Sequence, residues 1–461
     1  MVHLGQVTND SEIQKDAQDG IDMTNLGPEG SQPDDFETSI YGSRFAAEDL
    51  PRHEMPEKEM PAATAYRMIK DDLTLDGNPT LNVDWCIADV PTVTADIQNR
   101  CVNMIARLFN IPTHDDDSNA MGTSTVGSSE AIMLATLAMK KSWVNKRKAE
   151  GKDYSRPNII MNSAVQVCWE KAARYFDVEE KYVYCTKDRY VIDPKEAVDL
   201  IDENTIGICS ILGTTYTGEY EDTKAINDLL KVVSINVSGH KYGLVYPGVG
   251  WCIWRDPKYL PTELIFNINY LGADQASLTL NFSRGASQVL GQYYQLIRLG
   301  KHGYRAIMFN LTRTADYLAA SVQKMGFLLM SQTRGKGLPL VAFRLNPDDD
   351  HKFDEFAIAH QLRQRGWVVP AYTMAPHSEG LKMMRVVVRE DFSRSRCDAL
   401  IADIKLAMET LGKMDEQKIK EHKEQIAKHG TATGRHKKMN QHFTDEKHSL
   451  QGKTGKTHAV C

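Results

Sequence analysis

The chain has 461 residues, of which 42% are hydrophobic and 25% charged, a composition typical of soluble globular proteins and long enough for more than one domain. Its 55 basic and 61 acidic side chains leave a formal net charge of −6, which excludes a global field that would favour nucleic acid or an anionic membrane. No apolar run reaches transmembrane length, and residues 1–22 lack the pattern of a signal peptide. We therefore expect a cytoplasmic protein that binds neither nucleic acid nor membranes.

Eight cysteines are scattered through the chain, with no Cys-x-x-Cys pair and no histidine at a metal-ligand spacing. We expect reduced thiols and no metal site, and several of the cysteines are predicted to be small core residues. The eight are Cys86, Cys101, Cys168, Cys185, Cys209, Cys252, Cys397 and Cys461.

The first 38 residues carry nine carboxylates against a single lysine, with few aliphatic side chains. Such a segment cannot form a core by itself, so the composition predicts a mobile acidic arm. Beyond it, residues 57–70 have helical character, and residues 73–79 are expected to form a strand and a turn. An amphipathic helix is predicted over residues 97–109, where apolar side chains recur at helical spacing.

Small hydroxyl residues and glycine precede an apolar helix that is predicted to start near Glu130. Ser128 and Ser129 would lie at the positive end of that helix, where free backbone N–H groups suit a phosphate. An ordinary N-terminal cap explains the same residues without any ligand. This motif alone leaves both interpretations open.

Residues 158–161, 181–185 and 205–215 have strand character and are separated by helical segments. The last is a continuous apolar run that ends in turn residues, which predicts a central parallel strand covered on both faces. A helix follows over residues 222–230, and a new strand is expected to begin at Lys231 without glycine, proline or a polar turn. Helix-to-strand connections usually take about two to six residues, so this junction predicts that a segment has been excised.

The predicted strand that includes Ser234 ends in Ser-Gly-His-Lys-Tyr-Gly, where the chain is expected to turn a corner at Lys241 before the apolar run 244–254. Most lysines at turns are solvated, but a lysine at the carboxyl end of a buried strand can meet a ligand. A nucleophilic lysine needs an amine that loses its proton near neutral pH, which partial desolvation beside other cationic groups favours.

A helix that ends at Gly300 is predicted to carry an apolar, core-facing stripe. Nearer the C-terminus, three strands and two helices form a β-α-β-β-α series, which is typical of a compact two-layer domain. Within the strand 381–389, period-two alternation places Arg385 on the face of Met383, where a bound carboxylate would satisfy an otherwise costly charge. The alternative is a charge that protects an edge strand from aggregation.

Three of these motifs together resemble the group II pyridoxal-phosphate-dependent decarboxylases, and glutamate decarboxylase in particular. They are Gly-Ser-Ser at 127–129, Gly-Thr-Thr-Tyr-Thr-Gly-Glu-Tyr-Glu at 213–221 and Asn-Val-Ser-Gly-His-Lys-Tyr-Gly at 236–243. The resemblance implies an α/β protein of pyridoxal-phosphate fold type I (aspartate aminotransferase-like), with a large mixed-sheet domain and a small α/β C-terminal domain. The implied divisions are an acidic arm and inter-subunit segment (1–65), the large domain (66–311), the small domain (312–411) and a basic polar tail (412–461).

The resemblance also implies pyridoxal 5'-phosphate as the cofactor and a role for each matching residue. Lys241 would hold the cofactor covalently, Gln166 would lie over its ring, and Thr215 would point at the ring or at the substrate. Without the resemblance, Gln166 would be taken for a surface residue. Arg385 would bind a substrate carboxylate. The residues expected to bind the cofactor phosphate are Ser128, Ser129, Ser238, His240 and Ser283.

The reaction implied is the decarboxylation of L-glutamate to 4-aminobutanoate (GABA) and carbon dioxide, in a homodimer or a higher oligomer. Two segments of the family pattern are missing, one after Asn82 and one after Leu230. The second would carry an aspartate that pairs with the pyridine nitrogen, and a protonated nitrogen makes the ring an electron sink. Two alternatives stay open: a catalytically impaired relative that acts only as a structural or regulatory partner, and a pyridoxal-phosphate enzyme for another amino acid.

Residues 413–461 carry eleven Lys and Arg residues against six acids. Plant members of the resembled family have a calmodulin-binding tail in this place. The present tail lacks the tryptophan or the leucine-rich face that such a helix needs, so the sequence favours a solvated tail over a calmodulin site.

Overall fold

The computed structural model describes residues 49–75, 93–112, 119–268, 275–282 and 284–414. The predicted acidic arm, the junction after Asn82, Ser283 and nearly all of the basic tail lie outside the described residues. The chain divides into two compact units, which we call the first and the second unit. The first comprises Met1–Gly127, Val237–Ile253 and Ile265–Gly303, and the second comprises Ser128–Asn236, Trp254–Leu264 and Tyr304–Cys461. The domain limits expected from the sequence stay predictions.

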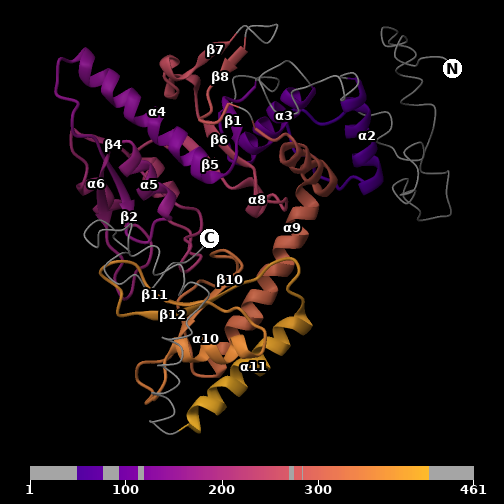
Figure 1. Ribbon diagram of the computed structural model, residues 1–461, viewed down its shortest axis with the longest axis vertical. Coiled ribbons are helices and arrows are strands. Elements are labelled where there is room, and N and C mark those ends of the chain that lie inside the picture. The colour runs from indigo at the N-terminus through magenta and orange to yellow at the C-terminus, as the bar shows by residue number, and fades with distance from the viewer. Residues whose placement is uncertain (1–48, 76–92, 113–118, 269–274, 283, 415–461) are drawn as a thin grey trace, which may run out of the picture. The chain divides into compact units, whose positions relative to one another are not determined.

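The first unit is built from helices around two short antiparallel strand pairs (Figure 1). β1 pairs with β6 in a register that sets Gly122 opposite Ile253, and α3 packs beside β1. The elements that lie wholly or largely in this unit are α2 (Ala62–Leu75), α3 (Val93–Leu108), β1 (Gly122–Thr125), α8 (Gly239–Tyr242), β6 (Gly250–Trp254), β7 (Phe266–Ile268) and β8 (Gln275–Ser277). The unit boundaries cross β5 (Ser234–Val237) and α9 (Ser287–Lys324).

The second unit begins with alternating strands and helices and ends with an antiparallel sheet. Its α/β part contains α4 (Ser128–Ala149), β2 (Asn158–Asn162), α5 (Val167–Tyr175), β3 (Glu179–Val183), α6 (Pro194–Asp199), β4 (Thr205–Ile208), α7 (Thr223–Leu229) and the 3₁₀ turns η6 (Pro257–Tyr259) and η7 (Thr262–Leu264). Its C-terminal part contains β9 (Leu328–Leu329), β10 (Leu340–Arg344), α10 (Glu355–Gln364), β11 (Ala371–Thr373), β12 (Lys382–Val387) and α11 (Arg394–Gly412).

β2 is the central strand of a parallel sheet with the order β3-β2-β4. Its side chains alternate between two cores, because Ile159 and Met161 pack with residues of α4 and α5, whereas Ile160 packs with residues of α6 and α7. The sheet is therefore covered by helices on both faces, as its near-continuous apolar strands predict.

Two strands that were expected to be buried are instead half-buried edges. β4 is the edge of the sheet β3-β2-β4, and β5 is the edge of a separate sheet with the order β1-β6-β5. The prediction of a central strand at 205–215 is therefore wrong. An apolar run is buried only if neighbouring elements cover it. Within the described residues, β4 and β5 each pair with a strand on one side only.

The junction after α7 also differs from its prediction. The strand begins at Ser234 rather than at Lys231, so residues 230–233 form a connection of ordinary length. The argument from an abrupt junction is therefore wrong, and any excision at this point has to rest on comparison with other proteins.

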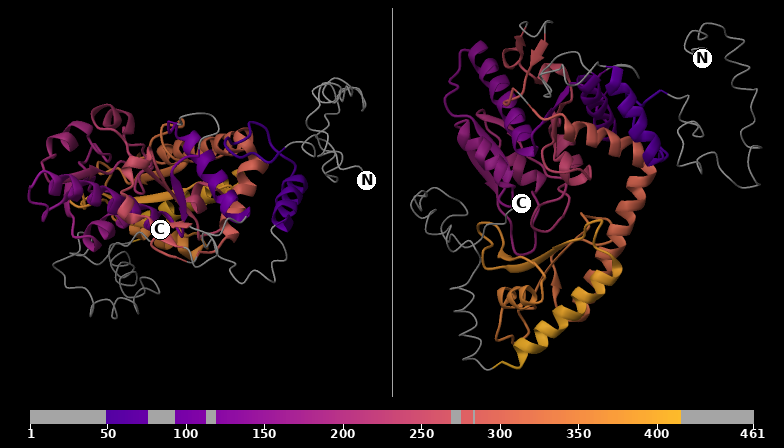
Figure 2. Two further views of the ribbon diagram at one scale, coloured as in Figure 1. Left: turned by 90° about the horizontal axis from the view of Figure 1, so that it is seen from above. Right: turned by 45° about the vertical axis from the view of Figure 1, so that its right-hand side comes forward.

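The C-terminal sheet has the order β11-β12-β10-β9 and two buried faces (Figures 1 and 2). One face packs with α10, α11 and the second part of α9, through side chains that include Phe343 and Met384. The other face includes Met383 and packs with Tyr372 and Tyr216. The expected β-α-β-β-α series is confirmed, and its alternation places Arg385 on the face of Met383, away from the helices.

Two helix boundaries differ from the sequence prediction. α2 continues to Leu75 through residues that were expected to form a strand, because Leu73 lies one helical turn beyond the buried Ile69 and extends its apolar stripe. α9 breaks at Gly300, which has φ 57° and ψ 179°, but the helix then resumes as far as Lys324. A Cβ atom on Gly300 would lie 2.3 Å from the Lys58 carbonyl oxygen, so only glycine fits there.

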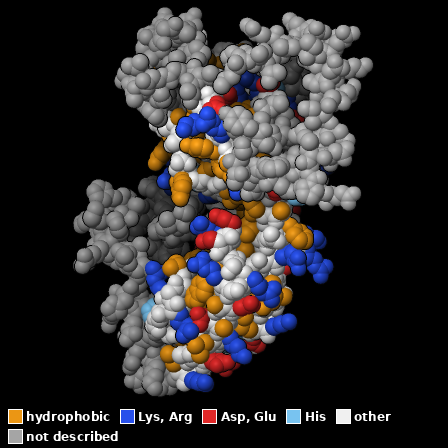
Figure 3. Space-filling view, turned by 90° about the vertical axis from the view of Figure 1, so that its right-hand side faces the viewer, with side chains coloured by type: hydrophobic (Ala, Val, Ile, Leu, Met, Phe, Trp, Pro, Cys, Tyr) orange, Lys and Arg blue, Asp and Glu red, His pale blue; other side chains and the backbone are white. Residues whose placement is uncertain are grey.

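On the face shown in Figure 3, Lys and Arg side chains are interspersed with Asp and Glu over the described surface. Among the helices that the structure describes, none combines the length and the apolar character needed to cross a bilayer. All six cysteines in the described ranges are buried, and none of them forms a disulfide. Burial raises the pKa of the Cys101, Cys185, Cys209 and Cys397 thiols, which keeps them protonated and inert.

Candidate active site

Lys241 lies in the single helical turn α8, directly after β5, and its side chain is exposed. Ser238 occupies the N-cap position of this turn without a side-chain capping bond, so the turn itself does not engage its hydroxyl. His240 Nδ1–H donates to the Val249 carbonyl oxygen at 2.9 Å, because a carbonyl can only accept. The neutral ring therefore presents Nε2 as an acceptor, and the protonated ring presents it as a donor.

The His240 ring also lies beside the glycine that precedes α4. A Cβ atom built on Gly127 would lie 3.6 Å from His240 Cε1. Ser128 follows Gly127 in the chain and starts α4, a helix of 22 residues whose first backbone N–H groups have no acceptor within the helix. Ser128 is half-buried and Ser129 is exposed. The first turn of α4 suits a phosphate, as the sequence predicts.

Ser129 and Gln166 meet at one residue that the sequence analysis missed, Cys168. The Ser129 Oγ and Cys168 Sγ atoms are 2.7 Å apart, and the Cys168 backbone N–H donates to Gln166 Oε1 at 2.8 Å. Gln166 is thus the N-cap of α5 and is half-buried, rather than a free surface residue. Its capping role was detectable only as the polar residue just before a helix, a weak signal for glutamine.

Thr215 and Arg385 are brought together although 170 positions separate them in the chain. Arg385 Nη1 donates to the Thr215 carbonyl oxygen, and the guanidinium carbon lies 5.5 Å from the centre of the Tyr372 ring. Arg385 Nε is buried and has no hydrogen-bond partner among the described residues. A half-buried, oriented guanidinium whose buried Nε donor is unsatisfied is suited to a carboxylate.

The Thr215 loop has further contacts in the second unit. Tyr372 Oη–H donates to the Tyr216 carbonyl oxygen at 3.2 Å, and the two rings pack edge to face. Burial raises the pKa of Tyr216 to about 12, with a smaller contribution from the charge of Glu170 on α5. Burial also raises the pKa of Tyr372, so both phenols stay protonated. No pattern in the sequence pointed to Tyr372.

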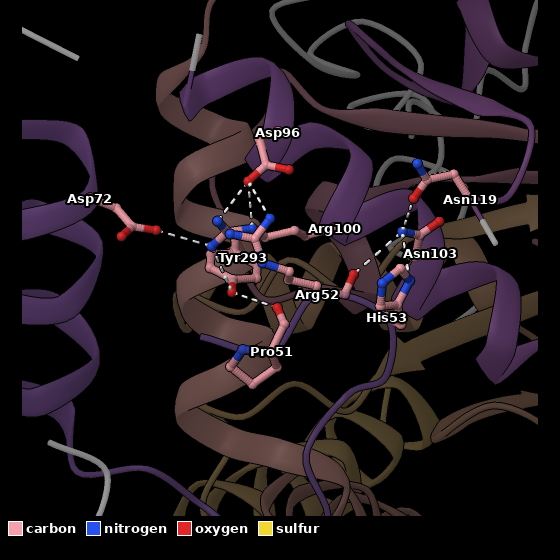
Figure 4. A network of polar contacts seen from close by, with 9 residues as sticks. All are labelled: Pro51, Arg52, His53, Asp72, Asp96, Arg100, Asn103, Asn119 and Tyr293. Atoms are coloured by element: carbon pink, nitrogen blue, oxygen red, sulfur yellow. Dashed lines mark hydrogen bonds and ion pairs between the residues drawn. The ribbon is translucent and has the colours of Figure 1, made fainter. Parts of the chain in front are cut away.

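A separate polar network in the first unit is structural (Figure 4). The Arg100 guanidinium on α3 contacts Asp96 at 2.6 Å and Asp72 of α2 at 3.1 Å, and it lies over the Tyr293 ring of α9. Tyr293 Oη–H donates to the Pro51 carbonyl oxygen at 2.6 Å. The network holds three helices and the segment before α2 together. The apolar stripe predicted on α9 accordingly includes a polar anchor at Tyr293.

Comparison with known proteins gives the class of this chain. It matches the pyridoxal-dependent decarboxylase conserved domain over residues 51–233 and 230–346. A glutamate decarboxylase of Petunia hybrida is 44% identical over 500 aligned positions, which cover 94% of this chain and 99% of the relative. Glutamate decarboxylase 1 of Arabidopsis thaliana is 46% identical over 437 positions, which cover 82% of this chain and 86% of the relative. The solved structure of a Lactobacillus brevis glutamate decarboxylase is 36% identical, with a TM-score of 0.66 over 82% of this chain and 99% of that chain.

These matches define a carboxy-lyase that uses pyridoxal phosphate and has the type I fold of such enzymes. The chain belongs to the pyridoxal-dependent decarboxylase family. The resemblance to glutamate decarboxylase, the fold class and the cofactor expected from the sequence are confirmed. The roles of individual site residues stay predictions.

The matches also bear on the predicted missing segments. The two stretches that match the family domain meet at residues 230–233, directly after α7. The alignment with the Petunia hybrida relative has 500 positions, more than the 461 residues of this chain, so that relative has internal segments without a counterpart here. Residues 229–236, which connect α7 to β5 and form most of β5, contain no carboxylate that could replace the expected aspartate.

The residues present therefore fit two parts of pyridoxal phosphate. In the second unit, the first turn of α4 suits its phosphate. In the first unit, the exposed Lys241 amine suits its aldehyde carbon. The part that would hold the ring nitrogen has no counterpart in residues 229–236.

Proposed function

We propose that this chain decarboxylates L-glutamate to 4-aminobutanoate and carbon dioxide. The observation that carries the proposal is the arrangement of Arg385, which the Thr215 carbonyl and the Tyr372 ring hold in place while its buried Nε lacks a partner among the described residues. A dicarboxylic amino acid offers the anion that this guanidinium needs. Relatives 44% and 46% identical that are named glutamate decarboxylase support the choice of substrate.

The chain's own residues bind and orient the reactants in this proposal. Pyridoxal phosphate, when bound, supplies the electron sink for the electrons left at Cα when the carboxyl group departs. Lys241 would hold the cofactor through its ε-amine and carry a proton at Nζ. Gln166 would lie at the cofactor ring, Thr215 at the ring or substrate, and Arg385 at a substrate carboxylate. The residues proposed to hold the phosphate are Ser128, Ser129, Ser238, His240 and Ser283.

The cellular location, the assembly and the partners of the enzyme are part of the same proposal. We infer a cytoplasmic homodimer or higher oligomer, as the resemblance to glutamate decarboxylase implies. We also infer that it binds neither nucleic acid nor membranes, because the net charge is −6 and the surface charges of Figure 3 are mixed. A calmodulin site in the tail is the weaker possibility, because residues 413–461 lack an apolar helical face.

A second candidate function is a catalytically impaired relative that acts only as a structural or regulatory partner. It is favoured by the separation of β4 and β5 into two three-stranded sheets and by the absence of a carboxylate at 229–236. Without an acid beside the ring nitrogen, the cofactor would be a poor electron sink even if it were bound.

The test combines cofactor trapping with turnover. The purified full chain is incubated with pyridoxal phosphate, reduced with borohydride and mapped by peptide analysis, and carbon dioxide release from carboxyl-labelled L-glutamate is measured in parallel. Lys241→Ala is the control for both signals. Cofactor trapped on Lys241 together with turnover supports the decarboxylase. Trapping without turnover rejects it, and co-purification of the inactive chain with an intact glutamate decarboxylase subunit would support the partner role.

A further inference from the structure

Glu221 is a buried carboxyl group that the proposed mechanism does not use. Only 2% of the residue is exposed. Its Oε1 atom accepts hydrogen bonds from Asn162 Nδ2 at 2.9 Å and from the Ile192 backbone N–H at 3.2 Å, and Oε2 accepts from the Ile211 backbone N–H at 2.7 Å. Burial raises the pKa of Glu221, while these three donors oppose that rise.

The donors come from the ends of different elements in the second unit. Asn162 is the last residue of β2, Ile192 follows β3, and Ile211 follows β4. Asn162 is itself fixed, because its Nδ2 also donates to the Tyr190 carbonyl oxygen and its Oδ1 accepts from the Ala164 N–H. Glu221 therefore joins the carboxyl ends of β2 and β4 to the loop between β3 and α6, on the side of an α/β sheet where ligands bind.

Glu221 also closes the loop 211–221 at its base. Its backbone N–H donates to the Ile211 carbonyl oxygen at 3.1 Å, while its side chain accepts from the N–H of the same residue. At the tip of the loop, the Thr215 carbonyl oxygen accepts a hydrogen bond from Arg385. The base of the loop is thus held by Glu221, and its tip carries the acceptor that orients the arginine.

We propose that Glu221 is a positioning residue that fixes the loop 211–221 and, through the Thr215 carbonyl, the guanidinium of Arg385. The functional part of this inference rests on the proposed role of Arg385 in binding the substrate. Glutamine has nearly the same shape as glutamate but replaces one acceptor oxygen with an NH₂ donor. In Glu221→Gln this NH₂ group must face at least one N–H donor, so at least one hydrogen bond at the base of the loop 211–221 is lost.

The test compares Glu221→Gln with Asp222→Asn, which removes the same charge one residue further on. Asp222 is exposed and caps α7 by accepting from the Ala225 N–H, a role that asparagine performs equally well. Hydrogen exchange followed by mass spectrometry reports on the loop, and steady-state kinetics with L-glutamate report on Arg385. For Glu221→Gln we expect exchange in 211–221 to rise about tenfold and KM to rise about tenfold with a smaller change in kcat. Asp222→Asn should stay within about twofold of the unmodified protein in both.

Each outcome bears on the inference. Equal exchange in the two variants, or a change in kcat alone, would overturn it. If the unmodified chain does not turn over L-glutamate, the proposed function fails, but the exchange measurement still decides whether Glu221 holds the loop. If Glu221→Gln does not fold, the unmodified protein is used: the Ile192 and Ile211 amides should exchange as slowly as those of β2, and exchange as fast as in the exposed residues 187–188 would reject the role.

Discussion

Replacing Arg100 with methionine should destabilise the first unit by about 2 to 3 kcal/mol. The Arg100 side chain is 4% exposed and contacts Asp96 at 2.6 Å and Asp72 at 3.1 Å. Breaking a fully buried pair costs about 3 to 5 kcal/mol, because a charge is left without a partner in a dry site. The Asp72 and Asp96 side chains are 30% and 43% exposed, so water solvates them after the change and the cost is smaller. Methionine retains most of the packing against Tyr293.

The measurement is urea unfolding, with the loss read from the shift of the midpoint at unchanged slope. The matched control is Arg67→Met on α2, which removes an ion pair with Asp71 at the same four-residue spacing, where the side chains are 56% and 52% exposed. The control should lose less than about 0.5 kcal/mol. Equal losses in the two variants would refute the reasoning that burial, rather than pairing, sets the magnitude.

Three further changes test the site and its surroundings. Gly239→Ala would set a Cβ atom 2.7 Å from Trp251 Nε1, so we expect it to lower the thermal unfolding midpoint by several degrees, and an unchanged midpoint would show that α8 can shift. A hydrogen bond from Lys181 is the main reason that the pKa of Asp202 lies below its usual range, so Asp202 stabilises the fold above pH about 4 and this contribution is lost as the pH falls. Asp202→Ala should therefore cost about 1 kcal/mol at pH 7 and clearly less near pH 2, and a pH-independent difference in urea unfolding would contradict this. Arg385→Lys keeps the positive charge but loses the planar guanidinium that can bind a carboxylate through two N–H groups. The KM for L-glutamate should therefore rise about tenfold or more, and an unchanged KM would show that Arg385 is not in the substrate site.

The sequence alone determined the local elements and the class of the protein. The helix at α3, the strand β2 and the β-α-β-β-α series near the C-terminus followed from apolar periodicity and turn residues, which act over a few positions. The lysine motif, Gly-Ser-Ser and the Thr215 motif together identified a pyridoxal-phosphate decarboxylase, which the comparisons confirmed. Local patterns suffice for these features because the interactions that create them are local.

Only the tertiary structure decided what these elements meet. The apolar runs of β4 and β5 predict burial, but the structure makes each the edge of a different sheet, because burial depends on neighbours far along the chain. The contact of Cys168 with Ser129 and that of Glu221 with Asn162 were not predicted from the sequence. A hydrogen bond between residues tens of positions apart depends on how strands pair and helices pack, and no periodicity along the chain encodes that distance.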